Sequence, residues 1–131
     1  MENPDVQGHT TENKEVDFLK PKPIDLKKLS AGQRSELKGG LKYAMMENKA
    51  FNVLGSAHKA LFYDTCNMIG RPESLAMLNV SGEEYYRNVS IEGQKRKEKK
   101  KFAKFTFDFV IPGTSNKLSI TKEWRHEDFA L

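Results

Sequence analysis

The chain has 131 residues and a mass of 15.0 kDa, with 37% apolar residues, 31% charged residues and a mean hydropathy of -0.69. This length allows one compact core and excludes two independent enzymatic domains. Eight Phe, four Tyr and one Trp exclude disorder of the whole chain. Neither the run of about 18 apolar residues that spans a membrane nor the apolar segment of a secretory signal is found. We therefore expect a cytoplasmic protein without a membrane partner, or a nuclear one if the source is eukaryotic.

The first part of the chain predicts a tail. Residues 1–28 mix Asn, Pro, Glu, Thr, Lys and Asp and show no sustained helical or strand period. We predict that residues 1–28 are a disordered tail and that residues 29–131 form a single α+β domain. The prolines at positions 21 and 23 favour extended geometry, so this part of the tail is also a candidate strap across the domain or docking segment.

The next part predicts two to three helices. Ser30 is a favoured N-cap, and four apolar residues after it share one helical face: Leu37, Leu41, Ala44 and Met45. Gly39-Gly40 predicts either a break into two helices, 31–38 and 40–47, or a close approach by another element, and we favour one kinked helix. Residues 50–54 are either a short strand or a helix extension. A second helix capped by Ser56 is predicted to present the stripe Ala57, Ala60, Leu61, Asp64 and Met68, and Pro72 begins a third short helix.

The C-terminal third changes to a period of two. Four residues of one strand point to the same side, namely Phe105, Phe107, Phe109 and Ile111, and Leu118, Ile120 and Trp124 repeat this after a turn. Lys122 is the one misfit on the inner side. Residues 81–92 fit either a capped helix or a strand, and we favour the strand. The sequence therefore predicts helices packed on a three-stranded antiparallel meander, with strands at about 84–92, 102–111 and 117–125.

Positive charge is concentrated in one segment. Six of the seven residues 95–101 are basic, whereas the rest of the chain holds 16 basic and 17 acidic residues. Like charges cannot be buried together, so we expect a solvated loop over residues 93–101. Such a loop can neutralise phosphates whatever their base sequence. The predicted nucleic-acid-binding residues are Lys95, Arg96, Lys97, Lys99, Lys100, Lys101 and Lys104, with Tyr86 as the exposed aromatic ring.

The function predicted from this segment is that of a small accessory protein that binds DNA or RNA through the phosphate backbone, as a monomer or homodimer. A loop that only aids solubility, a nuclear import signal and contact with an anionic membrane surface are alternatives for the same charges. The main alternative is a regulator or inhibitor of a larger macromolecular machine. This protein-interaction module would dock through residues 18–26, a sheet edge, or residues 124–131.

Catalysis, metals and cofactors have little support in the sequence. His58 and Cys66 are eight positions apart on one predicted helix, or about 12 Å, which is too far to share a proton. Cys66 is the only cysteine, so neither an intramolecular disulfide nor a multi-thiolate zinc site can form. His126 and its acidic neighbours are adjacent in sequence and rarely converge on one ion. We therefore predict a protein that is not an enzyme, with no catalytic residues, metal or cofactor.

Overall fold

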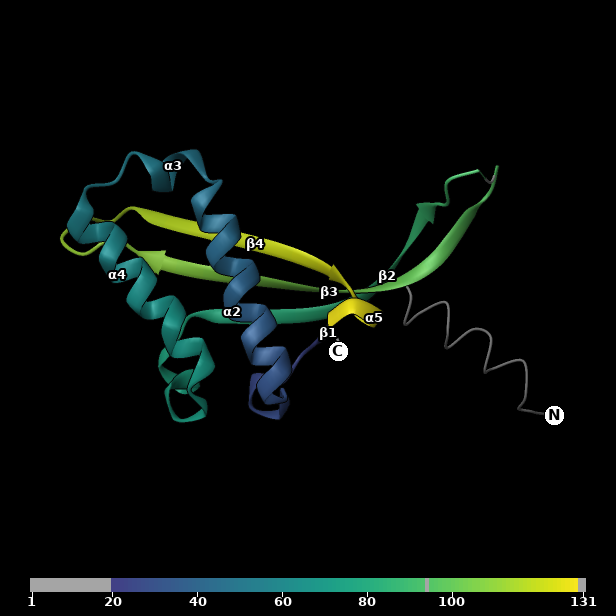
Figure 1. The fold of residues 1–131 in the computed structure, drawn as a ribbon, viewed down its shortest axis with the longest axis horizontal. Coiled ribbons are helices and arrows are strands. Elements are labelled where there is room, and N and C mark those ends of the chain that lie inside the picture. Colours follow the sequence, from purple (N-terminus) through teal and green to yellow (C-terminus); the bar gives the residue numbers. More distant parts are fainter. Residues whose placement is uncertain (1–19, 94, 130–131) are drawn as a thin grey trace.

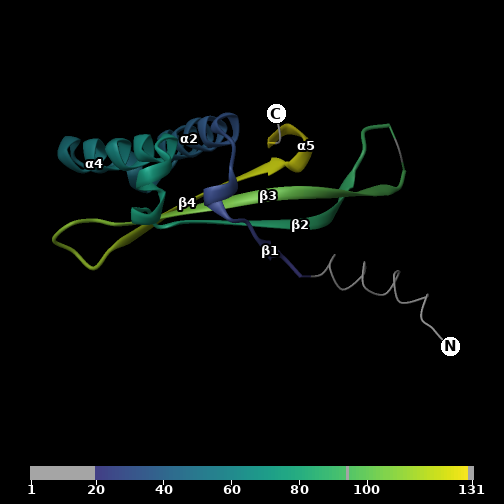
Figure 2. The same ribbon diagram turned by 90° about the horizontal axis from the view of Figure 1, so that it is seen from below.

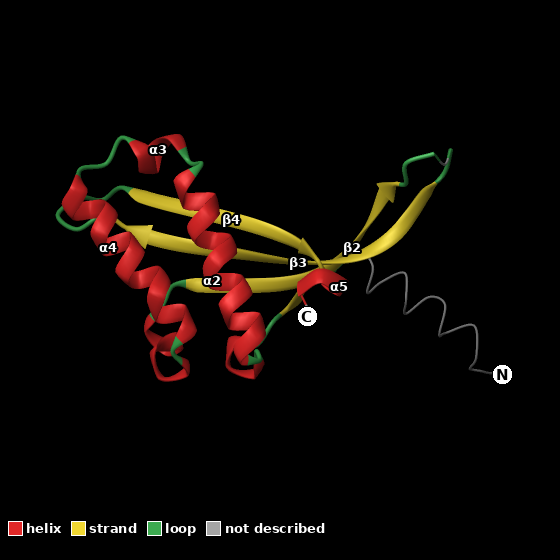
Figure 3. Ribbon diagram, in the orientation of Figure 1, coloured by secondary structure: helices red, strands yellow, loops and turns green. Residues whose placement is uncertain are grey.

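The computed structural model describes residues 20–93 and 95–129, which form an α+β structure. Two longer helices, α2 (Ala31–Met46) and α4 (Ser56–Asn67), lie over one face of an antiparallel sheet (Figure 1). Figure 2 shows both helices on the same side of the sheet, and Figure 3 shows the arrangement by secondary structure. The shorter helical elements are η1 (Leu26–Lys28), α3 (Lys49–Asn52), η2 (Met68–Gly70), η3 (Pro72–Met77) and α5 (His126–Phe129).

The sheet has four strands, so the prediction of three is wrong. They are β1 (Lys22–Pro23), β2 (Val80–Ser90), β3 (Lys97–Val110) and β4 (Lys117–Arg125), and they pair in that order. Lys22 lies opposite Glu84, Pro23 lies opposite Glu83, and the N–H of Ile24 donates to the carbonyl of Gly82 over 2.9 Å. Proline fits an edge strand because it has no N–H to donate. A two-residue strand has no period of its own, which is why the sequence did not reveal it.

The predicted tail is structured where the structure describes it. Residues 20–28, which the sequence analysis assigned to a disordered tail, form β1 and η1. The side chain of Asp25 accepts a hydrogen bond from the N–H of Lys27 and so caps η1. Residues 1–19 of the predicted tail lie outside the described part.

Helix α2 begins at the predicted cap. The Ser30 hydroxyl accepts from the Gln33 N–H, and the Gln33 side chain accepts from the Ser30 N–H, forming a capping box. The helix continues as one segment through both glycines, and at the second of them it meets Trp124 so closely that a Cβ on Gly40 would overlap the indole ring. The close approach was the correct alternative for Gly40. Three of the four predicted side chains, Leu37, Leu41 and Met45, are buried, while Ala44 is partly buried against the same core.

Helix α4 buries a different face from the predicted one. Its N-cap is Gly55, and its buried residues are Phe62 and Cys66, while Leu61 is exposed. Both faces have helical spacing, so the choice between them depends on what the helix packs against. The Phe62 ring lies 3.8 Å from the Phe109 ring and 6.2 Å from the Phe107 ring, measured between centroids. The aromatic side of the sheet therefore selects the aromatic face of the helix. The ambiguous segment 50–54 does not form a strand, and its first three residues belong to the short helix α3.

The helix-facing side of β3 and β4 completes the core. Five of its predicted residues are buried, namely Phe105, Phe107, Leu118, Ile120 and Trp124, while Phe109 and Ile111 are partly buried. The misfit Lys122 places its Nζ 6.0 Å from the centre of the Tyr43 ring, so its charge lies beside an exposed ring rather than in the core.

The predicted order of helices first and strands last fails at both ends of the described chain, because β1 precedes the helices and α5 follows β4. Helix α5 ends the described chain, and its Phe129 side chain is buried. The Phe129 ring lies 4.9 Å from that of Phe105 and 5.2 Å from that of Trp124. These contacts close the core at the end of the sheet near α5.

Strands β2 and β3 begin earlier than predicted. β2 covers residues 80–90 instead of 84–92, and β3 covers 97–110 instead of 102–111, while β4 matches its predicted bounds. The strand interpretation of residues 81–92 is confirmed over the helical one as far as Ser90. The predicted loop 93–101 is wrong in its second half, because Lys97–Lys101 belong to β3. Successive side chains of a strand point to opposite faces, so the charges of neighbouring lysines are held apart. Their repulsion therefore does not prevent this segment from pairing as a strand.

Candidate nucleic-acid interface

The predicted basic segment lies on a two-stranded extension of the sheet, which we call the basic arm and define as residues 86–101. The last pair between β3 and β4 is Phe102 with Arg125. Beyond it, β2 and β3 continue alone from the pair Tyr86–Lys101 to the pair Ser90–Lys97. Gly93 near the tip has a φ of 81°, a left-handed conformation that glycine adopts without strain. The arm projects beyond α5 in Figure 1 and bends toward the helix side in Figure 2.

The alternation of the two strands divides the arm into two faces. One face carries Lys97, Lys99 and Lys101 from β3, with Tyr86, Asn88 and Ser90 opposite them on β2. The other face carries Glu98 and Lys100, opposite Val89 and Arg87. The first face therefore joins three lysines and the tyrosine without an acidic side chain between them, and we call it the lysine face.

At the base of the arm, two of the predicted cations have carboxylate partners. The Nζ of Lys101 lies 2.7 Å from Glu84, and the Nζ of Lys104 lies 3.3 Å from Glu83. Glu84 also lies 3.2 Å from Nε2 of His126, so this carboxylate joins the arm to α5. The hydrogen bond to Glu84 raises the pKa of Lys101 above its usual value. The charge of Lys101 is thus balanced within the molecule, which weakens the prediction that it binds phosphate.

The cations nearer the tip are more exposed than those at the base of the arm. Lys95, Arg96, Lys97 and Lys99 are exposed. The first three have no carboxylate within 4.0 Å in the described part of the chain, whereas Lys100 lies 3.9 Å from Glu98. The predicted site therefore separates into an outer part of exposed cations and an inner part, Lys100, Lys101 and Lys104, with acidic neighbours.

Tyr86 lies where the sequence analysis placed an exposed ring. Its side chain is 38% exposed, and the Nζ of Lys101 lies 6.0 Å from its ring centre. Its neighbour Tyr85 points to the other face, as expected for adjacent strand residues. The structure thus brings Tyr86 onto the lysine face, next to the cations.

A cluster on the opposite side of the sheet fixes the base of the arm, and the sequence analysis missed it. The Phe102 side chain is only 4% exposed, because the Arg87 guanidinium lies 4.0 Å from its ring centre and the Tyr85 ring stacks at 6.1 Å. Glu123 accepts hydrogen bonds from Arg87, at 2.8 Å, and from the Tyr85 hydroxyl. Partial burial raises the pKa of Glu123. The sequence held one signal for this cluster: the period of two places Phe102 and Phe105 on opposite faces of the strand.

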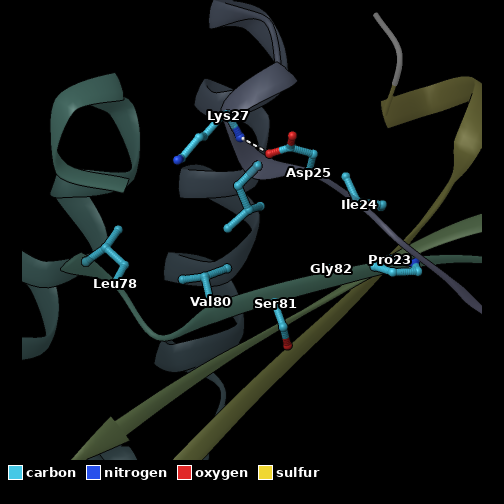
Figure 4. A pocket seen from close by; sticks show the side chains of 9 residues that line it. Pro23, Ile24, Asp25, Lys27, Leu78, Val80, Ser81 and Gly82 are labelled. Carbon is cyan, nitrogen blue, oxygen red and sulfur yellow. Dashed lines mark hydrogen bonds between the residues drawn. The ribbon is translucent and has the colours of Figure 1, made fainter. Parts of the chain in front are cut away.

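Two shallow hollows flank β1, away from the tip of the arm. The first has a volume of about 400 Å³ and is lined mainly by aliphatic side chains, among them Ile24, Leu78 and Val80 (Figure 4). Its one carboxylate, Asp25, already caps η1. The second hollow, of about 360 Å³, lies between the prolines of the β1 segment and Lys104. The second lining holds the hydroxyls of Ser81 and Thr106 with Glu83 and Lys104, but Glu83 and Lys104 pair with each other and no hydrogen bond joins them to either hydroxyl, as covalent catalysis would require.

Cys66 is a buried core residue. Its thiol lies 3.4 Å from the Lys38 carbonyl, and burial raises its pKa to about 11. Reactive cysteines have lowered pKa values, so this thiol has the opposite character from a catalytic one. Among the described residues, no three His, Cys, Asp or Glu side chains are grouped to hold a metal ion.

Comparisons with protein-family models, with curated proteins and with solved structures gave no match to this chain. Within residues 20–93 and 95–129, no helix has the length and apolar character that would be needed to cross a membrane. A functional proposal for this protein therefore depends on the chemistry of its own surface, in which the basic arm is the most distinctive feature.

Proposed function

We propose that this protein is a non-enzymatic accessory protein that binds the phosphate backbone of nucleic acid through its basic arm. The supporting observation is the exposure of Lys95, Arg96, Lys97 and Lys99 on an arm that extends beyond the body of the sheet. Clustered cations release counterions when they neutralise phosphates, and this supplies affinity with little dependence on base sequence. The proposal gives Lys100, Lys101 and Lys104 a smaller role than the sequence analysis did, because acidic groups already lie beside them.

The lysine face has a spacing suited to a linear polyanion. Its lysines alternate along β3, so they repeat every two residues, or about 6.8 Å. The lysines therefore form a straight row along one side of the arm, where an extended phosphate backbone can lie against them. Lysine acts as a point charge, whereas arginine forms the bidentate pairs that read guanine. The arm is therefore suited to holding a backbone and poorly suited to reading a sequence.

Tyr86 adds a feature that favours single strands. An exposed ring next to cations offers a stacking surface for a base, and such stacking contributes about 1–3 kcal/mol per base. A base inside a duplex is stacked on its neighbours and cannot use this ring without leaving the helix. The proposal therefore includes a preference for single-stranded DNA or RNA over duplex DNA.

The experiment compares two variants of equal net charge. One replaces the outer cations of the arm (K95Q, R96Q, K97Q and K99Q), and the other replaces four exposed lysines away from the arm (K27Q, K28Q, K49Q and K117Q). Binding to short labelled single-stranded and duplex oligonucleotides is measured by fluorescence anisotropy over a series of salt concentrations. If the arm binds phosphates, its variant loses between about 3 and 4 units of the slope of log K against log salt. The control variant keeps most of the slope.

A third variant, Tyr86→Ala, tests the preference for single strands. We expect it to weaken binding to single strands by about fivefold or more and to leave duplex binding nearly unchanged. Equal losses in the two lysine variants would show that only net charge matters and would contradict the arm as the site. Absence of any salt-dependent binding by the parent protein would contradict the proposed function itself.

The competing function, a protein-interaction module, depends on three segments. Two of them have partners within this chain: Lys22–Pro23 pairs with β2, and Phe129 is buried against Phe105 and Trp124. The sheet edges remain as docking surfaces. Recovery of a stoichiometric protein partner that still binds the arm variant, together with no nucleic-acid binding, would favour this function over the one we propose.

A further inference from the structure

A cluster of charged and titratable side chains joins three elements at the base of the basic arm. The Glu84 carboxylate of β2 lies 2.7 Å from the Nζ of Lys101 on β3 and 3.2 Å from Nε2 of His126, the first residue of α5. The exposed fractions of the Glu84, Lys101 and His126 side chains are 29%, 38% and 40%. One carboxylate is therefore shared between a lysine and an imidazole, and solvent reaches all three groups.

The cluster lies at the inner end of the lysine face. Lys101 is the innermost lysine of this face, and Glu84 is opposite Ala103, which lies two residues further along β3 on the same side. Figure 2 shows α5 on the helix side of the sheet, and the arm bends toward that side. A phosphate backbone that lies along the lysine face therefore meets Glu84 and His126 where the arm joins the body.

The net charge of the cluster depends on the protonation of His126. Histidine is the side chain whose charge ordinarily changes between about pH 5 and 8. While His126 is neutral, the charges of Lys101 and Glu84 cancel, and the carboxylate holds the lysine by a hydrogen bond. When His126 is protonated, two cations share one carboxylate, and the cluster gains one positive charge.

The surrounding charged groups belong to four elements. They are Lys22 of β1, which lies opposite Glu84, Lys99 of β3, Arg125 at the end of β4, and Glu127 and Asp128 of α5. Arg125 lies 3.9 Å from Glu127, so these two charges partly offset each other. Carboxylates, lysines and arginines ordinarily keep their charges between about pH 5.5 and 7.5. Among the described residues of this region, His126 is therefore the group that changes the local charge in this range.

We infer that Glu84 and His126 control the inner end of the lysine face: at neutral pH Glu84 holds Lys101, and protonation of His126 releases Lys101 to bind one further phosphate. This inference rests on the proposed function and adds its regulation by pH. The protonated imidazole becomes the partner of the carboxylate, so the departure of Lys101 does not leave Glu84 without a cation. The hydrogen bond to Glu84 raises the pKa of Lys101, so this lysine is a cation throughout the range.

The salt dependence of binding counts the phosphates that the protein neutralises. Binding of a short oligothymidylate, whose bases do not titrate in this range, is measured by fluorescence anisotropy at about pH 7.5 and 5.5. We expect the parent protein to bind about fivefold more tightly at the lower pH in about 50 mM salt. The slope of log K against log salt should become steeper by about 0.7, the value for one more phosphate of a single strand.

Substitutions of His126 separate its charge from its shape. H126Q takes up no proton and should lose the gain in affinity at low pH. H126K is charged at both pH values and should bind at the higher pH about as tightly as the parent does at the lower one. The matched control is H58Q, which removes a histidine from α4, away from the arm (Figure 1), and should keep the gain. A gain that persists in H126Q, or that disappears equally in H58Q, would overturn the inference.

Substitution of Glu84 tests the other half of the inference. E84Q leaves Lys101 without its carboxylate, so we expect tighter binding already at neutral pH. E47Q, at the end of α2, makes the same change of net charge away from the arm and should have a much smaller effect. Equal effects of E84Q and E47Q would show that Glu84 does not restrain Lys101.

A further test needs no nucleic acid. NMR spectra recorded over the pH range follow the ring signal of His126 and the Cε signal of Lys101. Because both groups contact one carboxylate, we expect the two signals to move over the same pH interval, and the Lys101 signal to stay fixed in H126Q. A Lys101 signal that does not follow His126 in the parent protein would overturn the exchange of partners at Glu84.

Together, these measurements separate failure of this inference from failure of the proposed function. Coupled NMR signals without any binding of the oligonucleotide would contradict the proposed function and support the exchange of partners at Glu84. Binding that depends on the outer cations of the arm but is the same at both pH values would support the function and overturn its control by His126.

Discussion

Two adjacent glycines in α2 show how much a single residue depends on its surroundings. Gly39 has nothing within 4 Å of where a Cβ would be, whereas a Cβ on Gly40 would overlap the Trp124 ring. Both glycines carry the same entropic cost in a helix, and both look alike in the sequence. Only Gly40 is required by the packing of α2 on β4.

This difference gives a prediction at the scale of one residue. Gly39→Ala should raise the free energy of unfolding by about 0.5–1 kcal/mol, because alanine is the better helix former in open space. Gly40→Ala should lower it by about 1–3 kcal/mol, because the added methyl group forces the indole or the helix to move. Urea denaturation of both variants and the parent measures the two changes. Equal stabilisation by both substitutions would show that Trp124 does not lie against Gly40.

The same dependence on surroundings explains which face of α4 is buried. The predicted stripe through Leu61 and the observed one through Phe62 and Cys66 are both consistent with a helix. A helix alone cannot decide between them, since each alternative buries several apolar groups. The rings of Phe107 and Phe109 decide it, because they lie on the sheet where α4 packs.

The two strands of the basic arm are hydrogen-bonded to each other, but few of their side chains are buried. Its strands are paired from Tyr86–Lys101 to Ser90–Lys97, yet every residue from Tyr86 to Asn88 on β2 and from Lys97 to Lys99 on β3 is exposed. An isolated two-stranded ribbon is only marginally stable in water. The cluster of Tyr85, Phe102, Arg87 and Glu123 stabilises the base, so stability should decrease from the base toward the tip.

Hydrogen exchange tests this gradient. After correction for intrinsic rates, we expect the amides of β3 between Lys97 and Lys99 to exchange about a hundredfold or more faster than those of Phe105 and Phe107. The tip can open locally, whereas the amides of the buried strand exchange only when the whole molecule unfolds. Similar protection along the whole of β3 would contradict this gradient.

The whole molecule is held together by residues far apart in the chain. Phe129 packs on Phe105 and Trp124, and Trp124 in turn lies against Gly40 of α2. One continuous core therefore joins the first long helix, the sheet and the last helix. This arrangement conflicts with an interpretation of Phe129 as a free docking residue.

Substitution of Phe129 tests this at the scale of the fold. Phe129→Ala should lower the free energy of unfolding by about 3 kcal/mol, as expected for a buried phenylalanine. Asp128→Ala, at an exposed neighbouring position, should change it by less than about 0.5 kcal/mol. Thermal and urea unfolding provide the measurement. A Phe129→Ala variant as stable as the parent would indicate that α5 contributes nothing to the core and would restore the docking interpretation.

The sequence by itself determined the features that depend on neighbours within one element. The period of two places Phe105, Phe107, Ile120 and Trp124 on the inner side of the sheet, and helical spacing places Leu37 and Leu41 in the core. The concentration of charge at residues 95–101 is likewise a property of the sequence alone. Each of these patterns can be recognised within one short segment of the sequence, because a strand or helix fixes which of its side chains share a face.

The tertiary structure decided which elements meet. It added β1, whose two residues become a strand only through β2, and it turned Lys97–Lys101 from a predicted loop into part of a paired strand. It also divided the predicted cations into those paired with Glu83 or Glu84 and those exposed toward the tip. These outcomes depend on contacts between residues distant in sequence, and the energy of such a contact exists only once the chain has folded to bring its partners together.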